Sequence, residues 1–157
     1  MTHRRIQIEE VSDWSDALDV LSVLPHRYPF LFVDRLRVVE PGRRALGLKR
    51  VTGTEWFGEP ELPNGEMPGL FVVEALAQTS AAVLIGLLDG SDGAIGYFAG
   101  ADRVKFRTLP RAGDTLVMSV ELVWYRRGVA RLSGIATIND QLSTRAEFTT
   151  VVRGRAA

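Results

Sequence analysis

The most apolar stretch of the chain runs from Gly69 to Leu88 and carries a single charged residue, Glu74. Its length approaches that of a transmembrane span. However, Gln78, Thr79 and Ser80 follow Glu74 closely, and a span would have to place these polar groups in lipid at considerable cost. A helix that is apolar on all sides is also what the centre of a globular domain requires. The pattern therefore predicts a buried core helix over residues 69–88.

Strand-like patterns occupy most of the remaining chain. Two such runs precede the expected helix and four follow it: 30–40, 43–52, 94–106, 115–125, 129–139 and 141–152. Turn-forming sequences separate neighbouring runs, at Pro41-Gly42, Arg127-Gly128 and Asn139-Asp140 and over residues 110–114. We therefore expect six strands, most of them joined by short turns.

A short amphipathic helix is expected near the N-terminus. Four apolar residues recur there at spacings of three and four: Val11, Trp14, Leu18 and Leu21. Ser12 is a candidate N-cap, and Pro25 follows the pattern. The complete order predicts an α+β fold in which one antiparallel sheet wraps a central helix. We expect one domain over residues 1–157, with residues 1–23 as an N-terminal extension.

Composition narrows the possible functions. The 157 residues include 19 Lys and Arg against 19 Asp and Glu, so no net field attracts the molecule to nucleic acid or anionic lipid. The chain has no cysteine and two histidines, His3 and His26, which argues against disulfides and a metal site. The N-terminus is too charged for a signal peptide. We expect a cytoplasmic protein without a cofactor.

Six segments in chain order carry a family resemblance: LPHRYPFLFVDR (24–35), KRVT (49–52), MPG (67–69), EALAQ (74–78), GADRVKFR (100–107) and PRAGDTL (110–116). Together they resemble the FabZ-type (3R)-hydroxyacyl-[acyl-carrier-protein] dehydratases, and six ordered matches are more specific than one short motif. The resemblance implies the hot-dog fold and action on acyl-carrier-protein thioesters in fatty-acid or polyketide synthesis. It also implies a dimer with sheets joined edge to edge, sites at the dimer interface, and in many members a hexamer.

Dehydration of a 3-hydroxyacyl thioester needs a base, an acid for the leaving hydroxyl, and donors for charge on the thioester oxygen. Gly69 follows Pro68 at the expected helix start, where its backbone N–H would face an oxyanion. By resemblance, this N–H polarises the thioester carbonyl and Glu74 shuttles a proton. Gln78 lies one helical turn after Glu74 and could hold either Glu74 or a backbone amide.

The chain departs from the family at its catalytic histidine. Members carry Gly-His-Phe-Pro before Met-Pro-Gly, and that histidine is the principal base; here the segment reads Pro60-Glu61-Leu62-Pro63 and is one residue shorter. Glu61 is the best occupant of the histidine position, with Pro60 the alternative. Two carboxyls in one apolar slot could form an acid–base pair or an inactive site. We expect His26 to hold backbone rather than abstract a proton.

The resemblance also implies where the carrier protein and the acyl chain bind. Acyl carrier proteins are acidic, and Arg103, Lys105 and Arg107 alternate along one expected strand and so share a face. Three further arginines are expected at nearby strand ends: Arg111, Arg126 and Arg127. Tyr97 and Phe98 fall where members place an aromatic gate to the acyl tunnel. A solvated strand face and a core aromatic are the simpler interpretations of these two groups.

Three functions remain open from the sequence. The first and favoured one is a dehydratase with a remodelled site and weak activity. The second is a hot-dog thioesterase that uses Glu74. The third is a non-catalytic acyl-binding subunit in a mixed dimer with a second, histidine-bearing dehydratase.

Overall fold

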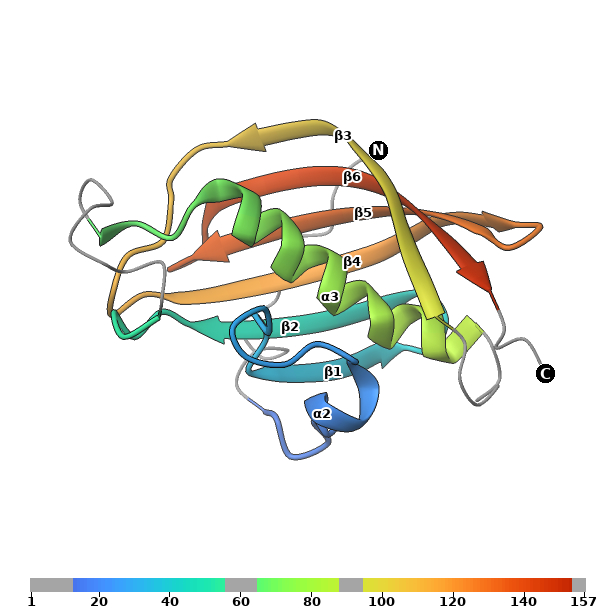
Figure 1. Cartoon of the computed structure of the whole chain (residues 1–157), viewed down its shortest axis with the longest axis horizontal. Helices are drawn as coiled ribbons and strands as arrows, with labels where there is room; N and C mark the ends of the chain where they lie inside the picture. Colours follow the sequence, from blue (N-terminus) through green and yellow to red (C-terminus); the bar gives the residue numbers. More distant parts are fainter. Residues whose placement is uncertain (1–12, 56–64, 88–94, 154–157) are drawn as a thin grey trace.

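The computed structural model describes residues 13–55, 65–87 and 95–153. Its elements are α2 (Val20–Val23), β1 (Arg35–Glu40), β2 (Arg44–Arg50), α3 (Gly69–Leu87), β3 (Ile95–Phe106), β4 (Thr115–Arg126), β5 (Val129–Ile138) and β6 (Gln141–Arg153). The six strands form one antiparallel sheet in the order β1-β2-β4-β5-β6-β3. The predicted α+β architecture is confirmed, with the central helix wrapped by the sheet (Figure 1).

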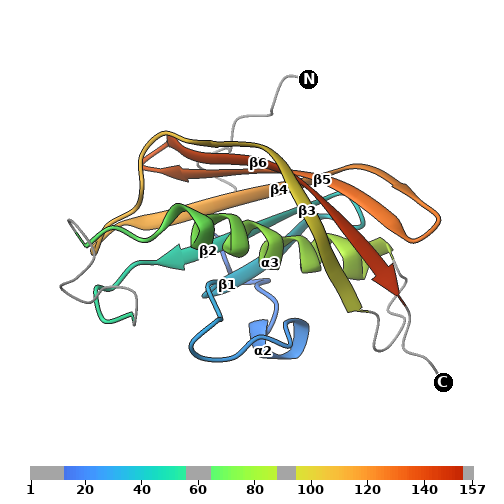
Figure 2. The same ribbon diagram turned by 45° about the horizontal axis from the view of Figure 1, so that its top comes forward.

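The sheet curves around α3, with β1 and β2 on one side of the helix and β3 on the other (Figure 2). Although α3 is long and apolar enough to cross a membrane, ten of its residues are buried, among them Val72, Leu76 and Val83. Gly47 of β2 lets the helix approach closely, because a Cβ there would lie 2.2 Å from the Thr79 hydroxyl oxygen. The helix is therefore the core of the domain, as its pattern predicts.

Two turns have the backbone conformations that their sequences favour. Gly42 (φ 67°) makes the β1–β2 turn and packs against the end of α3, where a Cβ on Gly86 would lie 2.2 Å from the Gly42 nitrogen. Asn139 (φ 48°) and Asp140 (φ 62°) make the β5–β6 turn, as expected for residues that tolerate the left-handed region. Each hairpin therefore closes where the sequence predicts.

The N-terminal helix is shorter than predicted. Of the expected pattern, residues 11 and 12 lie outside the described residues, and α2 covers only Val20–Val23. Leu18 instead donates its backbone N–H to Leu36 of β1, and the Asp19 side chain caps the helix by accepting from the Leu21 N–H. Apolar periodicity did not distinguish a helix from a segment that pairs with a strand edge.

β3 is an edge strand with two irregularities. Its register against β6 shifts between Phe98 and Gly100 and again between Asp102 and Lys105. Arg103, in the second bulge, has a φ of 51°. Four large apolar residues of this strand are exposed: Tyr97, Phe98, Val104 and Phe106. An exposed apolar edge is a surface on which another strand can pair.

Candidate functional site

Gly69 is the first residue of α3. The next turn is held by Pro68, whose carbonyl accepts from the N–H of Phe71 at 2.9 Å. Within the described residues, the Gly69 N–H has no acceptor, as expected for the first turn of a helix, and the helix dipole favours negative charge there. The Phe106 ring covers this residue so closely that a Cβ would lie 2.6 Å from it. A residue with a side chain would therefore displace Phe106.

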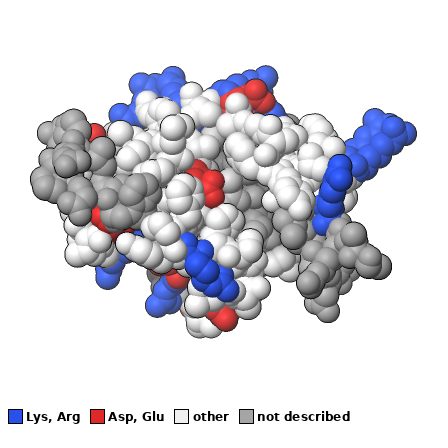
Figure 3. Space-filling view, in the orientation of Figure 1, with Lys and Arg blue, Asp and Glu red and all other residues white. Residues whose placement is uncertain are grey.

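Glu74 follows Gly69 by five residues, about 7–8 Å along the helix axis. Its neighbours Val73 and Ala75 are buried, whereas the Glu74 side chain remains 30% exposed. Its Oε1 accepts a hydrogen bond from Gln78 Nε2 at 2.9 Å, the contact that the helical spacing allows. The face over α3 is mostly uncharged, with one acidic group near its centre and Lys and Arg toward the margins (Figure 3).

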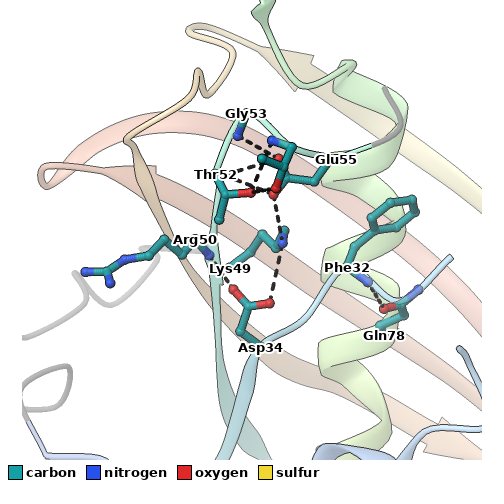
Figure 4. A network of polar contacts seen from close by, with 9 residues as sticks. Phe32, Asp34, Lys49, Arg50, Thr52, Gly53, Glu55 and Gln78 are labelled. Atoms are coloured by element: carbon teal, nitrogen blue, oxygen red, sulfur yellow. Dashed lines mark hydrogen bonds and ion pairs between the residues drawn. The ribbon is translucent and has the colours of Figure 1, made fainter. Parts of the chain in front are cut away.

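Gln78 is 2% exposed and links the helix to the segment before β1. Its Oε1 accepts from the Phe32 N–H at 2.9 Å, a contact drawn in Figure 4. Its Nε2 donates to the Phe30 carbonyl at 2.8 Å as well as to Glu74. The N–H of Phe32 requires an oxygen, so the amide has one orientation, which directs both Nε2 hydrogens to oxygen acceptors.

His26 contradicts its expected role. Its imidazole does not bind backbone in the described structure; instead Nε2 lies 3.4 Å from Glu74 Oε1, and the ring is 35% exposed. Its Nδ1 is buried without a hydrogen-bond partner among the described residues. Segments 24–35 and 74–78 are far apart in the sequence, and the Gln78 bonds to Phe30 and Phe32 bring them together. Sequence reasoning missed this residue because it treated the two motifs as separate sites.

Aromatic rings pack beside this polar group. Phe32 stacks on Phe71 with ring centroids 5.0 Å apart, and Phe30 meets Phe32 at 5.2 Å and Phe71 at 6.0 Å. Phe32 is buried, while Phe30 is 46% exposed. Phe71, three residues before Glu74 on α3, therefore packs against the aromatic residues of the segment that Gln78 binds.

The predicted base, Glu61, lies outside the described residues, as does its alternative Pro60. Glu55 is the last described residue before segment 56–64. Its carboxylate accepts from the backbone N–H groups of Thr52 and Gly53 and pairs with Lys49 at 3.2 Å (Figure 4). Burial opposes ionisation of Glu55, but these hydrogen bonds and the Lys49 charge lower its pKa to about 2. Lys49 also pairs with Asp34 at 3.4 Å.

Glu66, just after the same segment, is held in a similar way. Glu66 accepts from Arg111 Nε at 3.0 Å, and Met67 donates its N–H to the Pro110 carbonyl at 2.7 Å. Arg111 therefore forms an ion pair within the chain. It belongs to the frame of the site as well as to the predicted basic surface.

The predicted gate and docking residues are distributed along the sheet. Tyr97 and Phe98 are exposed and lie toward the C-terminal end of α3, because Gly96 packs against Leu84. Gly69 lies at the opposite end of this helix. In one subunit, the gate residues and the Gly69–Glu74 pair are therefore separated by much of the helix length.

The basic residues do not form one group. Arg103 makes a two-oxygen contact with Glu147 at 2.9 Å, so part of its charge is neutralised locally. Within the described structure, Lys105 and Arg107 have no acidic partner. Arg126 pairs in register with Val129 at the far end of β4 from Arg111. The expectation that Arg126 and Arg127 lie near the other basic residues is therefore wrong.

The assembled group comprises a free helix N–H at Gly69, a half-exposed carboxyl at Glu74, the amide of Gln78 and the imidazole of His26. Such a set can polarise a carbonyl and move a proton on an adjacent carbon. No group of three metal-binding side chains occurs among the described residues.

Comparison with known proteins gives consistent relatives. The sequence pattern of FabA-like domains matches residues 24–147. The 3-hydroxyacyl-[acyl-carrier-protein] dehydratase FabZ of Roseiflexus sp. (strain RS-1) is 43% identical over 131 residues, which cover 83% of this chain and 91% of that protein. FabZ of Syntrophotalea carbinolica is 40% identical over 141 residues, covering 89% and 96%.

Solved structures with the same fold are more distant in sequence. The dehydratase heterocomplex ApeI:P from Xenorhabdus doucetiae aligns with a TM-score of 0.74 and 18% identity, over 88% of this chain and 93% of that one. A hypothetical thioesterase from Streptococcus pneumoniae, solved with coenzyme A, aligns with a TM-score of 0.59 and 16% identity, covering 80% and 91%. These likenesses confirm the hot-dog fold.

Proposed function

The chain belongs to the FabA-like family together with the FabZ dehydratases, and from this membership we propose that it removes water from 3-hydroxyacyl thioesters of an acyl carrier protein. The substrate and reaction are those named for its relatives. Fatty-acid or polyketide synthesis in the cytoplasm is the corresponding setting. No cofactor is required, because the reaction is a proton transfer coupled to loss of hydroxide.

One observation carries this proposal: a partly exposed Glu74 lies five residues after Gly69, whose N–H has no acceptor among the described residues, on a mostly apolar helix. A thioester oxygen at the Gly69 N–H would have its charge stabilised by that donor and by the helix dipole. The carbon next to the carbonyl would then lie toward Glu74. This is the geometry needed to weaken and remove a proton at that carbon.

We propose that the site is completed in a dimer joined along β3. The strand is a sheet edge with four exposed large apolar residues. Antiparallel pairing of two copies would set the Tyr97 end of one β3 beside the Phe106 end of the other. Tyr97 and Phe98 of the partner subunit would then lie near Gly69, which Phe106 covers. This arrangement joins gate and proton-transfer residues that one subunit separates.

Carrier-protein docking is proposed at the Phe106 end of β3. Lys105 and Arg107 are exposed there and have no acidic partner among the described residues, while Arg103 is paired with Glu147. A free positive group can meet an acidic carrier protein without first breaking an internal ion pair. This end is also where α3 begins, so a thioester delivered there would reach Gly69.

The first test measures dehydration and hydration of a 3-hydroxyacyl/enoyl pair on an acyl carrier protein. We expect the wild-type protein to be weakly active, because the imidazole base of the family loop is replaced in segment 60–63. Glu74→Gln should abolish the activity. Glu61→His should raise the rate by about 10²-fold or more, the usual contribution of a well-placed base, and Glu74→Gln should cancel that gain.

Other outcomes would reassign the protein. Wild-type activity equal to that of a histidine-bearing relative, and lost in Glu61→Gln, would show that Glu61 is a working base. Thioester hydrolysis that depends on Glu74, without dehydration, would place the chain with the thioesterases.

The absence of histidine between Phe57 and Met67 favours a second candidate, a subunit whose missing base comes from a different dehydratase in a mixed dimer. This candidate predicts no activity alone. Activity should appear when the chain is mixed with a histidine-bearing dehydratase, and it should depend on Glu74 of this chain.

A further inference from the structure

We propose that His26 is a positioning residue for Glu74, and that the two together allow a single carboxyl to perform both proton transfers. This inference rests on the proposed dehydratase function. It concerns a histidine in the same subunit and in a different motif from the loop in which the family base is found.

Among the described residues, the polar contacts of Glu74 are confined to one of its oxygens. Oε1 accepts from Gln78 Nε2 at 2.9 Å and faces His26 Nε2 at 3.4 Å. Within the described structure, no hydrogen bond or ion pair reaches Oε2. The hydrogen bond from Gln78 and the facing imidazole nitrogen lie on the same oxygen, so they restrict the rotation of the carboxyl group and leave the other oxygen for the substrate.

The surroundings of the imidazole favour one tautomer. Nδ1 is buried and has no partner among the described residues, so a proton there would be a buried, unsatisfied N–H. The hydrogen is better placed on Nε2, which faces the carboxylate. In this tautomer the Nε2–H of His26 points toward the Oε1 oxygen of Glu74.

The loop that carries His26 is held by its neighbour. The Arg27 guanidinium donates to three backbone carbonyls, those of Leu21, Leu24 and His26, at 2.7–3.1 Å. On the other side, Gln78 binds Phe30 and Phe32. The imidazole therefore projects from a segment that Arg27 holds to α2 on one side and Gln78 holds to α3 on the other, as a positioning role requires.

One carboxyl can then carry out both proton transfers of the reaction. Oε2 of Glu74 takes the proton from the carbon next to the thioester carbonyl, and the electron pair of that C–H bond forms the new double bond. The bond from the adjacent carbon to its hydroxyl breaks. The departing hydroxide receives the same proton from Oε2 and leaves as water, which returns Glu74 to a carboxylate. Throughout, Gln78 donates to Oε1, the His26 Nε2–H faces the same oxygen, and the Gly69 N–H stabilises the thioester oxygen.

The experiment replaces His26 in a His3→Gln background, so that the full-length protein holds no other imidazole. His26→Ala should lower kcat by about 10- to 100-fold, the size of a lost hydrogen bond to a charged group, with little change in KM. Added imidazole should restore part of the rate. His26→Phe, which fills the space without an N–H, should stay as slow as the alanine variant.

A spectroscopic measurement separates positioning from folding. In protein labelled with ¹⁵N-histidine, the single imidazole should show hydrogen on Nε2, and its Nε2 resonance should move in Glu74→Gln but not in Ser80→Ala. Ser80 donates to the Ala77 carbonyl on the same helix and does not contact Glu74. An Nδ1–H tautomer, or an Nε2 resonance unaffected by Glu74→Gln, would overturn the proposal.

The kinetic outcomes also decide between the two proposals. Wild-type kcat in His26→Ala or in His26→Phe, with Glu74→Gln inactive, would overturn the role of His26 and leave the dehydratase assignment standing. Full activity in Glu74→Gln would overturn both.

Discussion

Gln78 illustrates how one buried side chain serves both stability and the site. It satisfies the Phe32 N–H and the Phe30 carbonyl and donates to Glu74. A buried amide that meets all three needs cannot be replaced by an apolar residue without leaving backbone groups unpaired. The same change would free the carboxyl of Glu74 to rotate.

We therefore expect Gln78→Met to lower the free energy of unfolding by about 1–3 kcal/mol, because the Phe32 N–H loses its acceptor. The variant should also lose dehydration rate at temperatures where it remains folded. Urea unfolding and kcat measured on the same preparation check the two effects. Ser80→Ala is the matched control, since Ser80 is buried on the same helix but, within the described part of the chain, its hydroxyl bonds only to the Ala77 carbonyl. Equal losses in both variants would contradict this role for Gln78.

Among the individual residues of the site, the sequence predicted one side-chain contact of Glu74 and missed another. The pairing of Glu74 with Gln78 follows from a spacing of one helical turn. The approach of His26 to Glu74 does not, because it depends on how the loop that carries His26, 48 residues before Glu74 in the chain, folds back onto α3. Glu61, the residue on which the choice of base depends, lies outside the described residues, so its role remains a prediction.

At the scale of elements, β3 is a strand at the edge of the sheet, so one of its two sides has no neighbouring strand in the described sheet. The positions of all six strands follow the sequence pattern to within a few residues, except that the first run, 30–40, becomes a strand only from Arg35. Residues 30–32 are instead bound by Gln78. The two bulges of β3 had no sequence signal, since strand periodicity reports faces but not an inserted residue. Its exposed apolar side chains indicate a missing neighbour.

Wild-type protein should be a dimer at micromolar concentration, with β3 as the shared edge. Val104→Lys should weaken the dimer by tenfold or more, because a symmetric edge would bring two like charges together at a cost of over about 1.4 kcal/mol. Trp124→Lys is the control, since Trp124 is an exposed apolar residue on β4, away from the proposed edge (48% exposed against 37% for Val104). Sedimentation velocity over a concentration series measures both. A stable, folded wild-type monomer would refute the shared site.

On the scale of the whole molecule, the net charge is zero, but the basic residues discussed above form two groups at opposite ends of the sheet. Lys105 and Arg107 lie at the end where α3 begins, beside the Phe106 that covers Gly69, and Arg126 and Arg127 lie at the other end of β4. Chain order alone could not show this, because consecutive antiparallel strands return to alternate ends of the sheet. The proposed thioester site adjoins only the first group.

Affinity for an acidic acyl carrier protein should accordingly fall as salt is added. Arg107→Glu should raise Kd by about fivefold, equivalent to about 1 kcal/mol for an exposed pair, and it should reduce the salt dependence. Arg126→Glu, the same charge change at the far end, should have no effect. Isothermal titration at several salt concentrations provides the measurement. Equal effects of the two substitutions would show that only net charge matters.

The close approach of Gly42 and Gly86 limits where the protein can be engineered. Hairpin turns are the usual sites for epitopes or reporter peptides, but the β1–β2 turn is in backbone contact with the end of α3. A peptide inserted there would force the helix away from the sheet that wraps it. The exposed Asn139-Asp140 turn, which needs no glycine, is the place where a fluorescent tag could be carried without disturbing the core.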